Sequence, residues 1–552
     1  MGDLLSSILS FFERLFPRLV NRIKINVVVR KEKRRRPHPY SLWTSRTVGP
    51  PPDPSSESAD VAQAPHSGFA PSDYVSWPGL TERTYTGRHL PPDPNWTGAL
   101  PDERRVFDDL FRREGEIRPG KSTALFCFFA QWFTDSFLRT KHDDRRRHTG
   151  NNEIDYCQIY GLDETTAWTL RTRSGGRMRV RTLDGGDRLP FLVVRDGNGR
   201  GEIDPALHDL PYIDKAPGPP PTVGTRFKAG IERATGLAPL PAERWENMYA
   251  TGLDRGNSTI FYTALSTMCV REHNRIAGEL ARLQPGWDDD RLFETARLIN
   301  IHNVLEIVIE DYINHIAGEG TFKLDSGFAE REPWYRTNRI SLEFNLLYRW
   351  HSLVPDEVEF NGETLGHLDY RFNNLRLEQS SPEALINAAS AAPAGRIGVR
   401  NTPGFLEHAE IASIRLSREF RLQPFNAYCE RFGHGRYSSI DELAGDDART
   451  AATLKQLYGD DVDKVEFLAG LYAERRAKGS PDSVLPPVLR TMVAVDAFTH
   501  ILTNPVLSHQ VREAAFAPRI AHLIAGTGGV VGLMERTSRG PVKAVPSFSL
   551  TA

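Results

Sequence analysis

Cysteine is scarce in this sequence, and long apolar runs are absent. The 552 residues contain four cysteines, none close to another: Cys127, Cys157, Cys269 and Cys429. A thiolate metal site or a disulfide scaffold is therefore not expected, and a reducing compartment is the simpler interpretation. No stretch approaches the roughly 20 apolar residues that a membrane-spanning helix needs, which excludes an integral membrane protein.

An excess of charge of one sign is also lacking. The 69 Lys and Arg residues nearly balance the 71 Asp and Glu residues, which leaves a formal charge of −2. Because no overall electrostatic pull toward nucleic acid follows, we expect no nucleic acid partner. Internal repeats are missing as well.

The N-terminal stretch MGDLLSSILSFFERLFPRLVNRIKINVVVRKEKRRRP combines an apolar stripe with six basic residues between Arg30 and Arg36. This pattern fits a helix that lies on an anionic membrane through residues 1–36. An ordinary amphipathic helix packed on the body fits equally well. Asp3 and the lack of a small-residue cleavage site argue against a secretory signal, so we expect a cytoplasmic protein, which the first of these two alternatives would make peripheral on the membrane.

The chain divides by composition into three parts. Residues 1–48 form the N-terminal membrane-associating segment, and residues 49–99 form a linker and extended arm that begins with a Pro-, Ser- and Ala-rich stretch. Residues 100–552 form the main domain, where GRMRVRTLDGGDRLPFLVV predicts a minor hairpin. Helical periodicity dominates this domain and predicts helices over residues 101–116, 122–140, 224–235, 257–283, 288–318, 338–351, 382–391, 408–424, 438–443, 449–457, 460–475 and 484–502. We expect a mainly α fold, a common way to enclose a bulky cofactor between helices.

The stretch FCFFAQWFTDSFLRT predicts a buried helix that carries two polar side chains. Apolar residues recur in it at i, i+3, i+4 and i+7, while Gln131 and Asp135 lie four residues apart on one face. A buried carboxylate is costly unless it is paired, hydrogen-bonded or protonated. Asp135 is therefore either a satisfied structural acid or a working one.

A second group of polar residues occurs in RISLEFNLLYRWHSLVPDEV. On a helix from Ile340 to Trp350, three polar side chains would stand three residues apart and converge: Asn345, Tyr348 and His351. A neutral imidazole is a common ligand of haem iron, and a nearby tyrosine can store an oxidising equivalent. The chain has 16 histidines, so spacing alone does not distinguish His351 from a structural histidine.

Four motifs together resemble the animal-type haem peroxidases, in particular their fatty-acid-oxygenating branch, which contains the cyclooxygenases. These are FFAQWFTDSF, LDRGNSTIFYTALSTMCVREHNRIAGEL, LFETARLINIHNVLEIVIEDYINHIAG and LEFNLLYRWHSLVPD, in that order. The resemblance spans about residues 100–504 and implies one large helical haem domain.

The resemblance also implies residue roles. His351 matches the proximal haem ligand, Asn345 a residue that hydrogen-bonds near it, and Tyr348 the tyrosine that abstracts hydrogen from the fatty acid. Gln131 matches the distal glutamine. Asp135 falls where the family has its distal histidine, which is the main departure from the pattern.

Arg255 is a second departure. It lies 16 residues before Arg271 of REHNR, where mammalian peroxidases but not cyclooxygenases keep a distal arginine. Such an arginine can polarise a peroxide bond and hold Asp135 ionised. We expect slow peroxidase turnover, because a carboxylate replaces the histidine.

Other matching positions concern substrate and cofactor. RLVNRIKIN resembles the segment with the carboxylate-binding arginine, which places Lys24 there with Arg22 nearby, while Ile313 and Glu319 fall at the channel mouth. Arachidonate specificity is not implied, because the mouth residues differ. The family's positions for covalent haem attachment and for a calcium ligand hold other residues here, so we expect non-covalent haem b and no calcium: Ser258, Thr259 and Ser136.

The resemblance thus predicts a haem-dependent dioxygenase that adds O₂ to a long-chain fatty acid through a radical on Tyr348. The alternative is a haem peroxidase or peroxygenase in which Asp135 and Arg255 cleave peroxide and the organic substrate is small. A haem-binding protein without catalysis would leave Tyr348 and Arg255 without a purpose.

Overall fold

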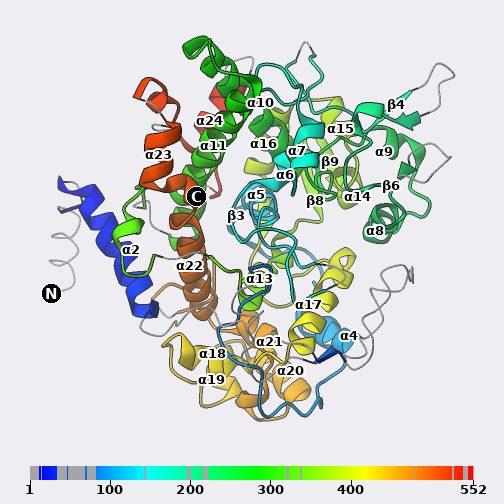
Figure 1. Ribbon diagram of the computed structural model, residues 1–552. Helices are drawn as coiled ribbons and strands as arrows, with labels where there is room; N and C mark the ends of the chain where they lie inside the picture. Colours follow the sequence, from blue (N-terminus) through cyan, green and yellow to red (C-terminus); the bar gives the residue numbers. More distant parts are fainter. Residues whose placement is uncertain are drawn as a thin grey trace.

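Helix α10 is buried over most of its length. In this computed structural model it spans Ile260–Leu283, and its first fourteen residues, Ile260 to His273, are all buried. A helix that is buried on every side must be packed by others all around it. Its neighbours, of which α11 lies beside it in Figure 1, are α5 (Ala124–Thr134), α11 (Asp289–Ile307), α16 (Pro382–Ala391) and α24 (Gly529–Thr537).

The structure describes residues 12–13, 15–33, 46–47, 69–70, 83–141, 144–183, 185–195, 201–214, 222–318, 322–335, 338–477, 479–516, 518–524, 528–538 and 545–550. The other α-helices in these ranges are α2 (Pro17–Lys33), α4 (Glu103–Val106), α6 (Cys157–Tyr160), α7 (Glu164–Leu170), α8 (Thr225–Thr235), α9 (Ala242–Glu246), α12 (Asn314–Ala317), α13 (Leu342–Leu347), α14 (His367–Tyr370), α15 (Leu375–Glu378), α17 (Glu407–Glu419), α18 (Phe425–Arg431), α19 (Ile440–Ala444), α20 (Ala448–Tyr458), α21 (Phe467–Ala473), α22 (Pro487–Leu502) and α23 (His509–Ala515). The expected mainly α fold is confirmed.

Strands are few and short. Within the described residues they form two-stranded antiparallel pairs: β1 (Arg46–Thr47) with β2 (Phe69–Ala70), β3 (Pro119–Thr123) with β10 (Pro393–Gly395), β4 (Val193–Arg195) with β5 (Gly201–Ile203), β6 (Ile213–Asp214) with β7 (Thr222–Val223), and β8 (Glu357–Phe360) with β9 (Glu363–Gly366). The expected hairpin also forms, because Arg181 and Arg188 exchange both backbone hydrogen bonds. The pair β3–β10 positions the start of α5, which follows β3 directly.

Helix α2 lies along one side of the body against α22, blue beside brown in Figure 1. Its inner face buries Val20, Ile25 and Val29. Asn21 ties the helix to the body by donating from Nδ2 to the Lys323 carbonyl at 2.8 Å. An exposed set of large apolar side chains, here called the apolar stripe, lies just before this helix and along its outer face: Phe12, Leu15, Phe16, Leu19, Ile23 and Val27.

Parts of the N-terminal prediction lie outside the described residues. These include positions 1–11 and 34–45 and most of the linker. The expected boundaries at residues 48 and 99 stay predictions. Among the helices that the structure describes, none is both long and apolar enough to cross a bilayer.

Candidate active site

The end of α5 carries the first two candidate residues. Bulky rings bury this helix, and Phe128 stacks on Phe261 with ring centres 4.4 Å apart. The helix ends at Thr134, so Gln131 lies in its last turn and Asp135 is its C-terminal cap residue. The aromatic helix predicted from the sequence therefore delivers both polar groups at one end.

Asp135 is buried and only partly satisfied. Its Oδ1 accepts a hydrogen bond from Nη1 of Arg255 at 3.4 Å, and its side chain is 8% exposed against 59% for Arg255. Oδ2 is buried without a hydrogen bond to any described residue. The carboxylate therefore keeps a spare acceptor beside an accessible guanidinium.

The loop before α10 approaches the same end of α5. Ser258 accepts a hydrogen bond from Nε2 of Gln131 at 3.0 Å. Thr259 caps α10 by accepting from the Tyr262 amide. The structure thus brings together Gln131, Asp135 and Arg255, which the sequence analysis assigned to the distal side.

The expected helix over residues 338–351 ends earlier than predicted. Helix α13 stops at Leu347, and a one-turn 3₁₀ helix begins at His351. The rings of Tyr348 and Trp350 lie 4.7 Å apart. Residues two apart point away from each other on an α-helix, so this contact requires the chain to leave helical geometry at Tyr348.

The phenol of Tyr348 lies in an apolar, aromatic environment. Its ring meets Phe344 edge-on at 5.6 Å, and its hydroxyl oxygen is buried. Burial and the nearby Asp496 raise the pKa of Tyr348 far above its usual value, against a smaller opposing effect of the Tyr312 hydroxyl. Tyr348 therefore keeps its phenolic hydrogen at any physiological pH.

His351 is held from one side by a carboxylate. Its Nδ1 lies 2.7 Å from Oε2 of Glu410, whose side chain is 2% exposed. A carboxylate only accepts hydrogen bonds, so Nδ1 carries the hydrogen and Nε2 presents its lone pair. Nε2 has no hydrogen-bond partner among the described residues, and this is the form of imidazole that binds metals.

Asn345 has other partners than the expected one. Its Nδ2 donates to Oγ1 of Thr140 at 2.7 Å, and its Oδ1 accepts from Nη2 of Arg349 at 2.9 Å. In the described part of the chain it makes no hydrogen bond with His351. The place beside the imidazole belongs to Glu410, which the sequence analysis missed.

A sequence signal for Glu410 did exist. The buried residues of α17 include Glu410, Ser413, Ile414 and Ser417, spaced at i, i+3, i+4 and i+7, with Leu416 beside them. An acid on the buried stripe of an amphipathic helix needs a partner. The pattern alone does not say which residue supplies it.

The electrostatic environment of Arg349 includes members of both groups of candidate residues. Burial and the neighbouring Arg255 lower the pKa of Arg349, while Glu410 and Asp135 oppose this effect. Arg349 therefore lies close enough to interact electrostatically with the Asp135–Arg255 pair and with the partner of His351.

The structure describes three of the four residues expected at the substrate entrance. Nε of Arg22 lies 2.5 Å from Asp325, and Nζ of Lys24 lies 2.5 Å from Glu13, so both cations already have acidic partners. Ile313 is buried. Glu319 lies outside the described residues.

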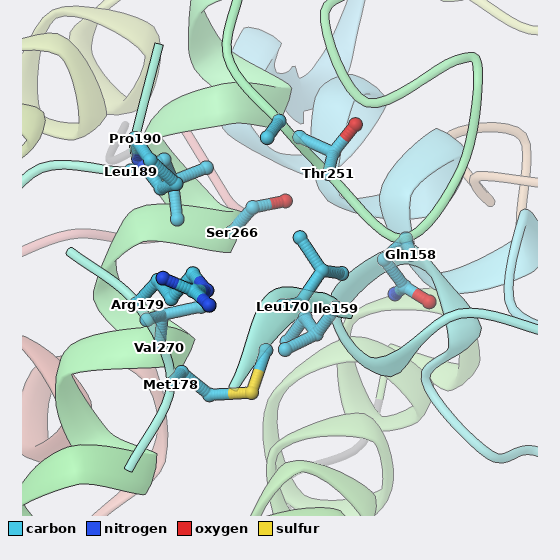
Figure 2. Close-up of a pocket in the computed structure, with 11 residues that line it drawn as sticks. Gln158, Ile159, Leu170, Met178, Arg179, Leu189, Pro190, Thr251, Ser266 and Val270 are labelled. Atoms are coloured by element: carbon cyan, nitrogen blue, oxygen red, sulfur yellow. The ribbon is translucent and has the colours of Figure 1, made fainter. Parts of the chain in front are cut away.

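A separate small pocket lies between α6, α7 and α10 (Figure 2). Gln158, Leu170 and Ser266 are among its lining residues, and Ser266 accepts a hydrogen bond from the indole of Trp132. None of the candidate residues described above lines this pocket. It is not part of the candidate active site.

Comparison with models of known protein families identifies the class to which this protein belongs. A family model described as animal haem peroxidase matches residues 151–501, which makes the protein a haem-dependent oxidoreductase. The chain belongs to the animal haem peroxidase family, as the resemblance of its motifs implied. The donor set fits the cofactor, since the Nε2 of His351 has no hydrogen-bond partner among the described residues while Glu410 holds Nδ1.

Relatives with known names support the membership. Mouse prostaglandin G/H synthase 1 is 33% identical over 450 residues, which cover 79% of this chain and 68% of that protein. Bovine prostaglandin G/H synthase 2 is 30% identical over 483 residues, 85% of this chain and 73% of that protein.

Solved structures share the fold. Peroxidase A from Dictyostelium discoideum matches with a TM-score of 0.65 at 18% identity, over 84% of this chain and 95% of that chain. Fatty acid alpha-dioxygenase from Oryza sativa matches with a TM-score of 0.66 at 16% identity, over 98% of this chain and 95% of that chain. At these identities the similarity shows the fold alone.

Proposed function

We propose that the protein is a haem-dependent fatty-acid dioxygenase that uses Tyr348 as hydrogen abstractor. The observation that carries the proposal is the buried phenolic hydroxyl of the partly buried Tyr348, which keeps its hydrogen three residues before His351. Relatives named prostaglandin G/H synthase, and a fatty acid alpha-dioxygenase solved with palmitic acid, support a long-chain fatty acid and O₂ as substrates.

The cofactor in this proposal is a non-covalent haem b held through Nε2 of His351. When bound, the haem supplies the one-electron oxidation that converts the phenol to a radical. Ser258 and Thr259 have no carboxylate for an ester link, and their hydroxyls accept hydrogen bonds from Gln131 and Tyr262. Ser136 donates its hydroxyl to the Phe133 carbonyl, and we propose no calcium there.

Tyr348 then carries the reaction with the fatty acid. The tyrosyl oxygen takes one hydrogen atom from a C–H bond of the acyl chain, which leaves a carbon radical and restores the phenol. O₂ adds to that carbon and forms a peroxyl radical. The peroxyl radical takes the hydrogen back from Tyr348, so a hydroperoxy fatty acid leaves and the tyrosyl radical is ready again. The net change is the addition of one O₂ to one fatty acid.

Asp135 and Arg255 serve the activation step. A spare carboxylate oxygen can move a proton from one oxygen of a hydroperoxide to the other, while the guanidinium stabilises negative charge on the departing oxygen. Gln131 is held by Ser258 and is proposed to orient the hydroperoxide beside them. This step is needed only to generate the first radical.

The substrate is proposed to enter from the side of α2. The apolar stripe can lie on a membrane that contains the lipid, and the protein would then be a peripheral membrane protein. A fatty-acid carboxylate must compete with Asp325 for Arg22 and with Glu13 for Lys24. Ile313 and Glu319 are proposed to shape the mouth of the channel.

The test is oxygen uptake by the haem-loaded protein with a panel of fatty acids. Tyr348→Phe should lower uptake at least about 100-fold, because the hydrogen acceptor is lost, while the haem spectrum and the reaction with hydroperoxide persist. Tyr156→Phe is the control, since it removes another fully buried phenolic oxygen. Undiminished uptake by Tyr348→Phe would contradict the mechanism.

A peroxidase with a small organic substrate is the second candidate. The accessible guanidinium of Arg255 beside a buried acid favours it, since such a pair suits peroxide cleavage. Guaiacol oxidation by hydrogen peroxide separates the two functions. A protein that turns over guaiacol rapidly and consumes no O₂ with any fatty acid is the peroxidase.

A further inference from the structure

Glu410 is one of the most deeply buried acids of the molecule. Its relative exposure is 1%, and it lies in the first turn of α17, on the face that packs into the body. Transferring an ionised carboxylate out of water is costly unless hydrogen bonds or opposite charge compensate. Its position therefore needs an explanation from its contacts.

The contacts of Glu410 converge on one carboxylate oxygen. Oε2 lies 2.7 Å from Nδ1 of His351 and accepts a second, longer hydrogen bond from Oγ1 of Thr402 at 3.3 Å. Oε1 is buried and has no hydrogen-bond partner among the described residues. Arg349 is near enough to interact with the charge. The short bond to the imidazole is therefore the main interaction of this carboxylate.

This arrangement acts on the other nitrogen of the ring. A carboxylate that accepts from Nδ1 fixes one tautomer, sets the rotation of the ring and pushes electron density toward Nε2. A neutral amide partner would fix the tautomer without donating charge. Asn345, the residue expected near the imidazole, is bonded to Thr140 and Arg349 instead.

We propose that Glu410 is a positioning residue that gives His351 partial imidazolate character and so stabilises the ferric state of the haem iron. The proposal rests on the assignment of His351 as the proximal ligand made above. It adds a determinant of reduction potential that neither the motifs nor the family match assigns. A more strongly donating ligand holds iron in the oxidised state and binds it more tightly.

The test uses the haem-loaded full chain and two readouts other than activity. These are the iron–histidine stretching frequency of the ferrous protein, from resonance Raman spectra, and the ferric/ferrous potential, from spectroelectrochemistry. Glu410→Gln keeps the shape and removes the charge, so the frequency should fall, the potential should rise and haem should dissociate about 10-fold faster or more. Glu410→Asp should give a potential between those of wild type and Glu410→Gln.

The variant Thr402→Val should shift the frequency and the potential in the directions opposite to those expected for Glu410→Gln. It removes the second donor to Oε2, so the carboxylate accepts more strongly from Nδ1, and the potential should fall and the frequency rise. This variant keeps the proposal testable if Glu410→Gln folds poorly. Glu272→Gln is the control, because Glu272 is fully buried and paired with Arg275 on its own helix α10 and with Arg536 on α24, away from His351. It should leave both readouts unchanged.

The outcomes separate this inference from the function on which it rests. If Glu410→Gln and Thr402→Val leave the frequency and the potential at the wild-type values, Glu410 is a structural acid and the inference is wrong. If the wild type has no iron–histidine band, or His351→Ala keeps it, the ligand assignment itself is wrong and both proposals fall.

Discussion

The expected rate at which this site activates hydroperoxide depends on one side chain, that of Asp135. It lies at the end of an aromatic helix, where the resemblance of the motif implies a histidine in the family, and its only charged partner in the described part of the chain within hydrogen-bonding range is the exposed Arg255. A carboxylate accepts a proton less readily than an imidazole at neutral pH. The protein is therefore expected to activate hydroperoxide slowly and to depend on a radical that persists once formed.

The variants Asp135→Asn and Asp135→His test this role. Asparagine cannot take up the proton, so the reaction with hydroperoxide should slow about 100-fold, at the low end of what general acid–base catalysis contributes. Histidine should speed it and raise peroxidase turnover. Stopped-flow mixing with a hydroperoxide measures both rates, and the resting haem spectrum should not change.

The control for this series is Asp254→Asn, which removes a nearby acid that pairs with Arg139 at 3.2 Å. It should leave the hydroperoxide reaction unchanged. Equal rates for wild type, Asp135→Asn and Asp135→His would make Asp135 a structural residue.

The sequence predicted candidate site residues only where they belong to a recognisable motif. Tyr348, His351 and the distal group followed from the resemblance, and their roles stay proposals. Glu410 was missed because its partner lies 59 residues away in sequence, and the approach of α17 to His351 is a property of the packed fold. Burial of an acid is visible in a pattern, whereas the partner it meets is not.

At the scale of elements, α2 is apolar on two faces. One face packs on α22, and the other presents the apolar stripe to solvent. A soluble helix normally places charged and polar residues on its outer face. A second apolar face on this outer helix therefore supports the proposed contact with a membrane surface.

The double variant Leu19→Asp/Ile23→Asp tests the membrane contact. Each of these side chains is worth about 1.5–3 kcal/mol when buried in an apolar phase, so binding to anionic liposomes should weaken at least about 100-fold. Cosedimentation measures it. Val194→Asp, at an exposed apolar side chain far from α2 in sequence, is the control and should bind as the wild type does.

Sedimentation of the double variant with liposomes as before would show that the stripe does not touch the membrane. Its oxygen uptake with a dispersed fatty acid should stay near the wild-type value, since the changes lie outside the candidate active site.

Several helices were predicted closely, because their period is a local property of the sequence, whereas the predictions 122–140 and 408–424 run past the observed ends of α5 at Thr134 and α17 at Glu419. Predictions for α8, α10, α16 and α20 match the observed bounds within three residues. The early end of α13 was not predictable in this way. It depends on the contact between Tyr348 and Trp350 and on the rings around them, which come from distant segments such as Phe126 and Tyr312.

At the scale of the whole molecule, buried histidines are expected to make the folded state less stable as the pH falls. Burial lowers the pKa of His273 and that of His302 to about 4. The unfolded chain has ordinary histidines with pKa near 6.5, so between about pH 6.5 and 4 the unfolded state binds protons that the folded state does not. Stability should therefore fall as pH falls through this window, by up to about 1.4 kcal/mol per pH unit for each histidine.

Acids with a pKa raised by burial oppose this trend in part: Glu153, Asp155, Asp311 and Glu474. Burial raises the pKa of Glu474 to about 7 and that of Asp155 to about 6, so their contribution to stability grows as pH falls through the same range. His315 and His408, also with pKa lowered to about 4 by burial, add to the histidine side. The net expectation is a lower Tm at pH 5 than at pH 7.

Thermal unfolding between pH 4.5 and 7.5 measures the slope. His273→Gln should make it shallower, because it removes one of the histidines whose pKa burial lowers. A Tm that rises steadily toward pH 5 would contradict the expected balance.

The first turn of α5 is completed by a remote part of the chain. The amide of Thr123 donates to the Phe548 carbonyl, and the Thr123 hydroxyl donates to Ser547, 424 residues later. Synthesis at about 5–20 residues per second puts roughly 20–85 s between the appearance of these two segments. Through that interval the helix that presents Gln131 and Asp135 is without its final cover, so a nascent chain carries this apolar helix incompletely buried until the segment around Phe548 has emerged.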